Sequence, residues 1–206
     1  MHPNSKLIFE KYAAPIFKSH IRVLEIGPNQ HPSTYQEIVR DNTINWETLD
    51  MNTRHTSTLT YVTDDEYSYP VLSNTFDIVF SAQVIEHVRK TWVWMKELSR
   101  ICKNGGYVIT INPLSWPYHE SPVDCWRIYP EGMKALYEEA GLKVITSKCE
   151  SLHIPESLKH YKYLLPGMSY QTEYSVIKLL IKQMLRLPVV YTLDTITIGI
   201  KENESK

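Results

Sequence analysis

Cysteine is scarce in this sequence of 206 residues, which contains only Cys102, Cys125 and Cys149. The intervals of 23 and 24 residues between them fit neither a zinc knuckle nor a redox pair. We therefore expect reduced thiols in a cytoplasmic protein.

Long apolar runs and an excess of positive charge are also missing. No stretch reaches the roughly 18 consecutive apolar residues of a membrane-spanning helix. The first five residues are polar and no apolar signal core follows them, so no secretory leader is predicted. The formal net charge of −1 provides no broad basic surface, and we expect no nucleic-acid partner.

Aromatic residues, in contrast, are abundant, with 14 Tyr and 5 Trp. Many of them fall between Trp92 and Tyr137, outside any simple strand pattern. Core packing accounts for some of these side chains, and the wall of a binding pocket would account for others.

The stretch Arg22–Gly27 has the pattern of a short strand buried on both faces, because three of its residues are aliphatic. Glu25 interrupts the apolar run, and a buried carboxylate needs a polar partner. Gly27 ends the strand, and Ser33 begins a helix with capping-box spacing to Gln36. A strand, a glycine turn and a helix N-terminus together predict a nucleotide-binding corner.

Strands and helices alternate along the rest of the chain, which predicts an α/β fold with a mainly parallel sheet and helices on both faces. An amphipathic helix over 4–19, kinked or ended by Pro15, is expected to cap the sheet or to cover the mouth of a cleft. Residues 150–190 are predicted to form a helical insertion before the last strand. The predicted strands are 22–26, 46–50, 59–62, 76–81, 107–111, 143–147 and 191–201, and the predicted helices are 33–40, 91–103, with Gly105 as its stop, and 130–140.

Asp50 follows Gly27 by 23 residues and ends the next predicted strand. In a doubly wound sheet these two strand ends flank the ligand crevice, where a carboxylate accepts hydrogen bonds from both ribose hydroxyls. An exposed strand-end aspartate is the alternative. The later glycines of the dinucleotide fingerprint are missing, which weakens the case for nicotinamide or flavin cofactors and favours a nucleoside cofactor without phosphates.

Four segments in the correct order resemble the motifs of class I S-adenosylmethionine-dependent methyltransferases. Val23–Gly27 is similar to the first motif, and Asp50 stands where the family has its ribose-binding acid. Phe76–Ser81 with Val84–Val88 resembles the fourth-strand motif, and Leu98–Gly106 resembles the next helix and its Gly-Gly turn. The resemblance covers about residues 20 to 147 and implies a Rossmann-like, doubly wound sheet of about seven strands, the last antiparallel.

The resemblance also implies which residues bind the methionine part of S-adenosylmethionine. Glu25 and Gly27 would lie at the methionine end and along the backbone side of the cofactor. Ser81 and Ala82 would place backbone carbonyls near the methionine amino group, and Gln83 would contact the same end.

For the adenosine part, Asp50 would hold the ribose and Met51 would lie against the adenine. Asp65 resembles the acid that accepts from the adenine amino group, although Asp64 is the alternative, and Glu66 would follow along the adenine edge. The chain departs from the family at Asn29, where glycine is usual. Because asparagine tolerates left-handed backbone angles, we keep Asn29 in the predicted cofactor turn.

The segment after the fifth predicted strand is rich in chemistry-bearing side chains and leaves the same edge of the sheet as the cofactor turn. It predicts an acceptor-binding loop, because buried structural loops rarely carry so many polar groups. The predicted acceptor-side residues are Asn112, Trp116, Tyr118, His119, Glu120, Asp124, Trp126 and Arg127.

His119 is the first choice for a general base, because imidazole titrates near neutrality. Its alternative is a histidine that only bonds loop backbone. Asp124 is a second catalytic candidate, unless it forms a structural ion pair with Arg127. His87 is a third, although a histidine in that turn commonly packs and bonds locally.

No metal site is predicted, because His87, His119, Glu120 and Asp124 lack a close metal-ligand spacing. Residues 176–187 form a basic amphipathic pattern. Such a helix could lie on an anionic membrane surface or close a homodimer, but we expect it to cover its own domain.

The sequence as a whole therefore predicts one methyltransferase domain over 1–206. It would transfer a methyl group from S-adenosylmethionine to an oxygen or nitrogen of a small-molecule acceptor. A nicotinamide-dependent oxidoreductase on a similar sheet and a non-catalytic cofactor-binding module are the alternatives.

Overall fold

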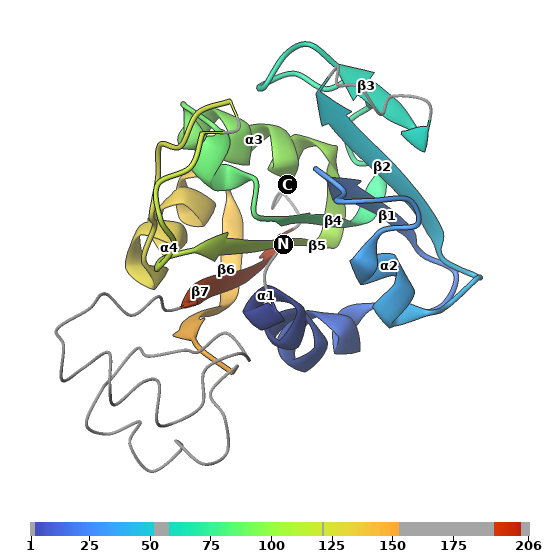
Figure 1. The fold of residues 1–206 in the computed structure, drawn as a ribbon. Helices are drawn as coiled ribbons and strands as arrows, with labels where there is room; N and C mark the ends of the chain where they lie inside the picture. The colour runs from blue at the N-terminus through green and yellow to red at the C-terminus, as the bar shows by residue number, and fades with distance from the viewer. Residues whose placement is uncertain (1–2, 52–57, 121, 153–191, 203–206) are drawn as a thin grey trace, which may run out of the picture.

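A seven-stranded sheet with the order β3-β2-β1-β4-β5-β7-β6 organises the protein (Figure 1). The computed structural model describes residues 3–51, 58–120, 122–152 and 192–202. Only β7 runs antiparallel to its neighbours, so the predicted Rossmann-like, mostly parallel sheet is confirmed. The strands are β1 Arg22–Ile26, β2 Asn45–Met51, β3 Tyr61–Thr63, β4 Phe76–Ala82, β5 Cys102–Pro113, β6 Leu142–Glu150 and β7 Asp194–Lys201.

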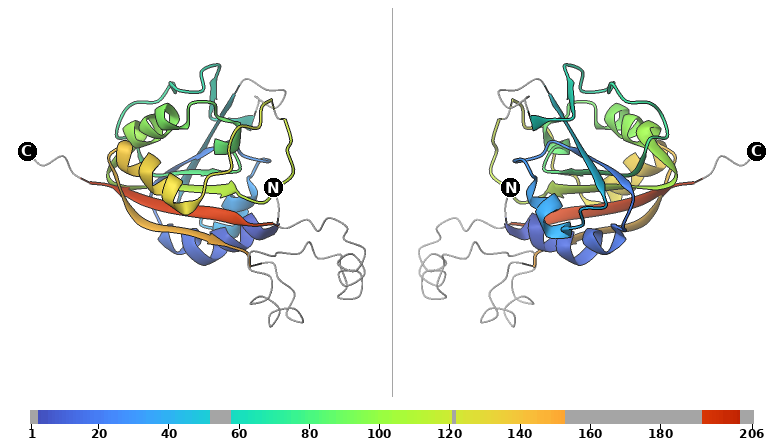
Figure 2. Two further views of the ribbon diagram at one scale, coloured as in Figure 1. Left: turned by 90° about the vertical axis from the view of Figure 1, so that its left-hand side faces the viewer. Right: turned by 90° about the vertical axis from the view of Figure 1, so that its right-hand side faces the viewer.

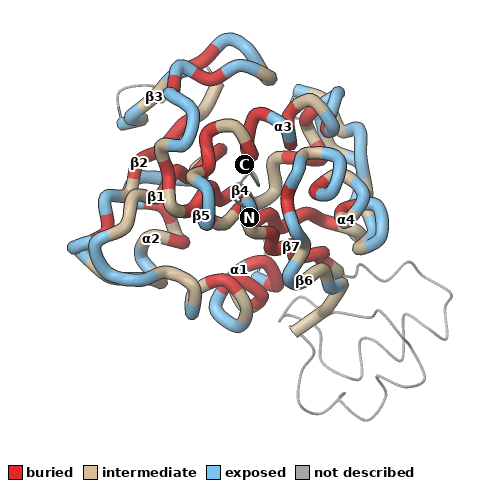
Figure 3. The backbone as a smooth tube through the Cα atoms, turned by 180° about the vertical axis from the view of Figure 1, so that it is seen from behind, coloured by how far each residue is buried: buried red, intermediate tan, exposed pale blue. Residues whose placement is uncertain are grey.

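Helices cover both faces of the sheet. The helices α3 (Thr91–Ile101) and α4 (Pro130–Glu139) lie on one face, while α1 (Pro3–Ile8) and α2 (Thr34–Val39) lie on the other (Figure 2). Alternate residues of the central strands point to opposite faces of the sheet and pack into two separate apolar cores. Buried positions therefore concentrate in the middle of the sheet (Figure 3).

The strand order brings the carboxyl ends of β1, β2 and β4 together. In the parallel ladders Ile26 lies opposite Leu49 on one side and opposite Ser81 on the other. The chain therefore leaves all three strands at the same end of the sheet, beside the central strand β1. Crevices for ligands form at such an edge of an open α/β sheet.

The N-terminal helical segment is shorter than the predicted 4–19. It begins as α1, widens into a π-helical turn at Phe9–Ala13, and ends as a 3₁₀ turn at Ala14–Ile16. Pro15 explains the change, because its ring would clash with the carbonyl four residues earlier in a regular α-helix. Phe17 is already extended, so the end of the predicted helix was wrong by three residues.

The helix α3 also ends earlier than predicted. Cys102 is extended and pairs with Phe76 in the sheet, so the helix stops at Ile101 rather than at Lys103. Gly105 does have a positive φ of 77°, but it lies within β5, beside a shift in register between β5 and β4, and is not the helix stop.

The predicted insertion over 150–190 falls largely outside the described residues, because β6 runs to Glu150 and the description resumes at Thr192. The basic stretch 176–187 lies wholly outside them. Among the helices that are described, none combines the length and apolar character needed to cross a membrane.

Candidate active site

A cavity of about 530 Å³ opens at the carboxyl ends of β1, β2 and β4. Gly27 and Asp50 lie on its wall, as do Gln83 and His87 from the chain after β4. The cavity therefore joins the predicted cofactor corner to the start of the predicted acceptor side. Its lining residues are Ile26, Gly27, Leu49, Asp50, Met51, Thr63, Glu66, Tyr69, Gln83, Val84, His87, Val88, Trp94 and Pro122.

Gly27 makes the sharp turn at the mouth of this cavity. Its φ is 70°, its amide donates to the carbonyl of Leu49 at 2.9 Å, and a Cβ at this position would collide with the side chain of Val84. A residue with a side chain would meet both a backbone and a steric penalty here. Glycine is thus required by the geometry of the turn.

Asp50 stands at the end of β2 between two cavities. Its carboxylate accepts a hydrogen bond from the amide of Met51 at 2.7 Å, and burial raises its pKa. A partly buried carboxylate with so few donors gains from hydroxyl groups that enter the cavity. Two ribose hydroxyls would supply such donors.

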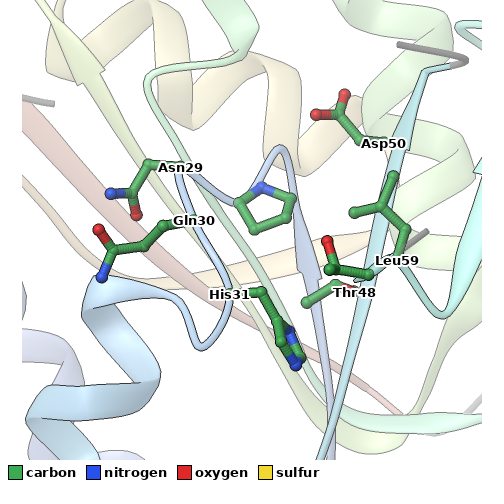
Figure 4. Close-up of a pocket in the computed structure, with 8 residues that line it drawn as sticks. Asn29, Gln30, His31, Thr48, Asp50 and Leu59 are labelled. Carbon is green, nitrogen blue, oxygen red and sulfur yellow. The ribbon is translucent and has the colours of Figure 1, made fainter. Parts of the chain in front are cut away.

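A second cavity of about 380 Å³ lies on the other side of Asp50. Asn29, Gln30 and His31 line it from the loop after β1, and Thr48 and Asp50 line it from β2 (Figure 4). The side chain of Asn29 donates to Thr34 Oγ1 at 3.1 Å. Asn29 therefore braces the turn and lies on the wall of this second cavity.

Glu25 points away from both cavities, toward the face covered by α2. It is 1% exposed and accepts hydrogen bonds from the hydroxyl of Ser33 and from Trp46 Nε1, the latter at 2.8 Å. Ser33 is also the N-cap of α2, as predicted, and its oxygen accepts from the Gln36 amide at 3.0 Å. Burial raises the pKa of Glu25 to about 7. Glu25 thus joins the cofactor turn to the helix behind it.

Gln83 links both ends of the chain at the edge of the cavity. It adopts a left-handed φ of 60°, and its amide group donates to Ser5 Oγ at 2.7 Å and to Asp194 Oδ1 at 3.2 Å. Asn4 donates to the other oxygen of Asp194 at 2.6 Å. Ser81, which donates to the carbonyl of Ile26 at 3.3 Å, ends β4 with Ala82 just before this point.

At the far wall the structure places Glu66, rather than Asp65, on the cavity. Glu66 accepts from Arg89 at 2.8 Å through Oε1, while its Oε2 is buried with no partner among the described residues. Asp65 is exposed and caps its own turn by accepting from the amide of Tyr67 at 2.7 Å. The unpartnered oxygen of Glu66 is suited to a donor on a bound ligand.

The 3₁₀ turn η4 (Ile85–His87) lies on the predicted acceptor side, where His87 lines the cavity. Glu86 is 1% exposed and burial raises its pKa to about 8. Nδ1 of His87 lies 2.5 Å from the carbonyl of Val123, and the ring of His87 meets that of His119 edge to face at 5.0 Å. Two imidazoles and a buried carboxylate therefore meet at this side of the cavity.

The loop that carries His119 is held by an ion pair. The two oxygens of Asp124 accept from the Arg127 guanidinium at 2.5 and 2.6 Å, and one also accepts from the His119 amide at 2.8 Å. The guanidinium lowers the pKa of Asp124 to about 2. These contacts occupy Asp124 and favour the structural role that the sequence left open for it.

Of the remaining predicted acceptor residues, some contact the backbone of the folded domain and others are exposed to solvent. Asn112 is buried and donates to the Ile128 carbonyl at 3.0 Å, and the carbonyl of Trp116 accepts from Arg127 at 3.4 Å. Trp126 donates from Nε1 to the Val88 carbonyl at 2.9 Å. Tyr118 and Glu120 are exposed and bond to each other at 2.7 Å.

Comparison with known proteins agrees with this geometry. Residues 22–110 match a family model described as a methyltransferase domain, and no protein of curated function matches the sequence. A methyltransferase of Archaeoglobus fulgidus, described as dependent on S-adenosylmethionine (SAM), has a similar fold, with a TM-score of 0.62 at 20% identity over 96% of this chain and 94% of that one. The chain thus has a segment similar to the methyltransferase domain model, within the fold of a SAM-dependent methyltransferase.

Two further structures resemble the methyltransferase domain in fold. One is a chain from the complex between the Haloferax volcanii Trm112 methyltransferase activator and the putative methyltransferase, with a TM-score of 0.62 at 15% identity over 98% of this chain and 90% of that one. The other is Haemonchus contortus phosphoethanolamine N-methyltransferase 2 in complex with S-adenosyl-L-methionine, with a TM-score of 0.57 at 14% identity over 97% of this chain and 52% of that one. The predicted cofactor, S-adenosylmethionine, is confirmed at the level of the domain family.

Within the methyltransferase domain, the structure gathers Gly27, Asp50, Met51, Glu66 and Gln83 around the larger cavity. The carboxylates of Asp50 and Glu66 fit a nucleoside, because each retains unused acceptor capacity at the wall. The predicted Glu25, Asn29 and Asp65 lie next to this set without lining the larger cavity.

Sequence reasoning missed two aromatic residues on this wall. Tyr69 lies in the polar segment before β4, and Trp94 lies on α3, where Nε1 donates to the hydroxyl of Tyr69 at 2.5 Å. The sequence assigned the aromatic residues between Trp92 and Tyr137 to the core or to a pocket wall without singling out Trp94, and Tyr69 lies in no motif. Both side chains are almost fully buried, at 1% exposed for Trp94 and 7% for Tyr69, so they close the cavity from the side of the core.

Proposed function

We propose that this protein transfers a methyl group from S-adenosylmethionine to an oxygen or nitrogen of a small-molecule acceptor. The observation that carries the proposal is one cavity with Gly27 and Asp50 at one end and His87 at the other. We further propose that 1–206 acts as one cytoplasmic domain, in which the helix before β1 closes one side of the site.

The chemistry demands little from the protein beyond alignment. The sulfonium is an activated donor, so the acceptor atom attacks the methyl carbon in line as the bond to sulfur breaks. In this proposal Asp50 holds the ribose, Met51 and Glu66 border the adenine, and Gln83 fixes the methionine end. Proximity of the reacting atoms then supplies several kcal/mol of the barrier reduction.

An acceptor hydroxyl or ammonium also has to lose a proton. His119 is the proposed base, because its Nδ1 lies 3.2 Å from the Pro117 carbonyl and must carry the hydrogen of that bond, which leaves a lone pair on Nε2. The loop residues Trp116, Tyr118 and Trp126, with Asn112, Glu120 and Arg127, are proposed to shape the acceptor site. Replacing His119 with Gln should lower turnover and leave cofactor binding unchanged.

Calorimetric titration with S-adenosylhomocysteine tests the cofactor assignment. Asp50→Ala should weaken binding by about 1–3 kcal/mol, roughly 5- to 150-fold, because the ribose hydroxyls lose their acceptor. Glu139→Ala, an exposed acid on α4, is the matched control and should bind normally. Binding of NADH without binding of S-adenosylhomocysteine would instead support the oxidoreductase alternative.

A further inference from the structure

Three potential metal ligands meet at the acceptor end of the cavity. Glu86 and His87 belong to η4, and His119 comes from the loop after β5, more than 30 residues later in the sequence. One ligand atom from each of the three side chains lies within 4.8 Å of the other two. Spacing along the chain cannot reveal this cluster, because the two segments meet only in the folded protein.

The backbone carbonyls beside both imidazoles favour, in the neutral ring, the tautomer that a metal ligand requires. Nδ1 of His87 faces the Val123 carbonyl at 2.5 Å, and Nδ1 of His119 faces the Pro117 carbonyl at 3.2 Å. A carbonyl only accepts, so each Nδ1 carries the hydrogen and each Nε2 keeps its lone pair. Backbone carbonyls orient metal-binding histidines in this way in many proteins.

Glu86 supplies an independent observation that points to a ligand. Its side chain is 1% exposed, Oε1 lies 3.8 Å from His87 Nε2, and Oε2 has no hydrogen-bond partner among the described residues. A buried carboxylate without donors is costly unless a cation or a proton satisfies it. Its backbone carbonyl also accepts from the amide of Cys125 at 2.7 Å, which fixes the loop against η4.

We propose that Glu86, His87 and His119 bind one divalent transition-metal ion of the Co²⁺, Mn²⁺ or Zn²⁺ class at the acceptor end of the cavity. Two imidazole nitrogens and one carboxylate suit these ions better than Mg²⁺ or Ca²⁺, which prefer oxygen ligands. Metal–ligand bonds of about 2.1 Å place ligand atoms roughly 3–3.4 Å apart, so the three groups draw closer on binding. His119, with 39% of its side chain exposed, has room to make that movement.

The metal site extends the proposed function, and its role in catalysis rests on the proposed methyl transfer. Three protein ligands leave coordination positions open, and His87 lies on the cavity wall, so an acceptor hydroxyl can reach the ion. The bound hydroxyl releases its proton to water as the ion lowers its pKa, and the resulting oxygen anion attacks the methyl carbon while the carbon–sulfur bond breaks. With the ion bound, His119 Nε2 is a ligand and no longer a base.

Titration of the chelator-treated protein with Co²⁺ tests the site without any methyl acceptor. We expect one ion per chain and a visible absorption band from the coordinated cobalt. Glu86→Gln and His119→Gln should each weaken binding at least about tenfold, since even partners of metal ligands contribute about 10–100-fold. Glu131→Gln, an exposed acid on α4, should bind Co²⁺ as the parent protein does.

The outcomes separate the metal site from the proposed function. The metal site is overturned if the parent protein does not bind Co²⁺, or if Glu86→Gln and His119→Gln both bind it unchanged. Circular dichroism shows whether each variant is folded. S-adenosylhomocysteine binding with no Co²⁺ binding leaves the methyltransferase and His119 as its base. Co²⁺ binding with no S-adenosylhomocysteine binding would retain the metal site and remove the proposed reaction.

Discussion

The two ends of the cavity are built in different ways. At the cofactor end, Gly27 and Asp50 follow strands whose positions are fixed by parallel ladders on both sides. At the acceptor end, the loop is braced internally by the Asp124–Arg127 ion pair, and it is joined to η4 by the bond from Cys125 to Glu86 and the contact of His87 with the Val123 carbonyl. Many backbone hydrogen bonds of the sheet therefore hold the cofactor end, whereas the conformation of the acceptor end depends on single contacts such as the Asp124–Arg127 ion pair.

This difference predicts that single substitutions separate the two functions of the site. Loss of one loop contact should disable the acceptor end and spare cofactor binding, because the strand ends do not depend on the loop. Damage at the turn after β1 should affect cofactor binding first.

Asp124→Ala should have the largest effect. It leaves Arg127 without its carboxylate, at a cost of about 3 kcal/mol to the ordered loop, since removing one partner of a buried pair costs about 3–5 kcal/mol and Arg127 is partly exposed. Proteolysis or hydrogen exchange of the loop should accelerate, with S-adenosylhomocysteine affinity unchanged. Glu131→Ala removes an exposed pair with Lys134 at the same spacing and should cost less than about 1 kcal/mol. Equal effects of the two variants would contradict the assigned role of Asp124.

The pH dependence of stability should have opposite signs for Asp124 and for Glu25. Asp124 has a folded pKa of about 2, below its unfolded value near 3.9, so its contribution is present above pH 4 and is lost as the pH falls toward 2. Glu25 has a folded pKa of about 7, above its unfolded value near 4.3, so stability is lost as the pH rises from 4 through 7.

The loss of stability between pH 4 and pH 7 should therefore be smaller in Glu25→Gln by roughly 2–3 kcal/mol. Urea denaturation between pH 4 and 8 measures this difference. Some loss should persist in the variant, because burial raises the pKa of Glu86 in the same direction. A slope identical to that of the parent protein would show that Glu25 is ionised in its buried position.

The stability difference between Gly27→Ala and Gly105→Ala should be smaller than the loss from Asp124→Ala, but Gly27→Ala should have a specific effect on the cofactor. The collision with Val84 should make Gly27→Ala cost about 2 kcal/mol more than Gly105→Ala, because φ is positive at both glycines but a Cβ at Gly105 meets nothing within 4 Å. Urea denaturation measures the difference, and S-adenosylhomocysteine affinity should fall only for Gly27→Ala. If Gly105→Ala weakened the cofactor equally, the turn after β1 would not be the cofactor turn.

Much of the cofactor end could be predicted because it depends on local sequence. Val23–Gly27 encodes a strand and a turn, and Asp50 follows at the spacing of neighbouring parallel strands. Glu25 lines no cavity, because the pleat of β1 turns alternate side chains toward α2. Alternation predicts two faces, but the sequence alone does not say which face meets the ligand.

The acceptor end could be predicted only as a collection of residue types. The position of His119 beside His87 and Glu86 results from a loop held by long-range contacts, which leave no periodic signal. The bounds of the N-terminal helix and of α3 were wrong for similar reasons. Pro15 alters the helix from within, and pairing of Cys102 with Phe76 takes a residue from α3 into the sheet.

The two hydrogen bonds of the Gln83 amide connect residue 5, near the start of the chain, to residue 194, near its end. These acceptors lie 78 and 111 residues from Gln83 in the sequence, so the left-handed backbone at the edge of the cavity is held only by long-range contacts. A fragment that lacked β7 would leave the Gln83 amide without its Asp194 acceptor.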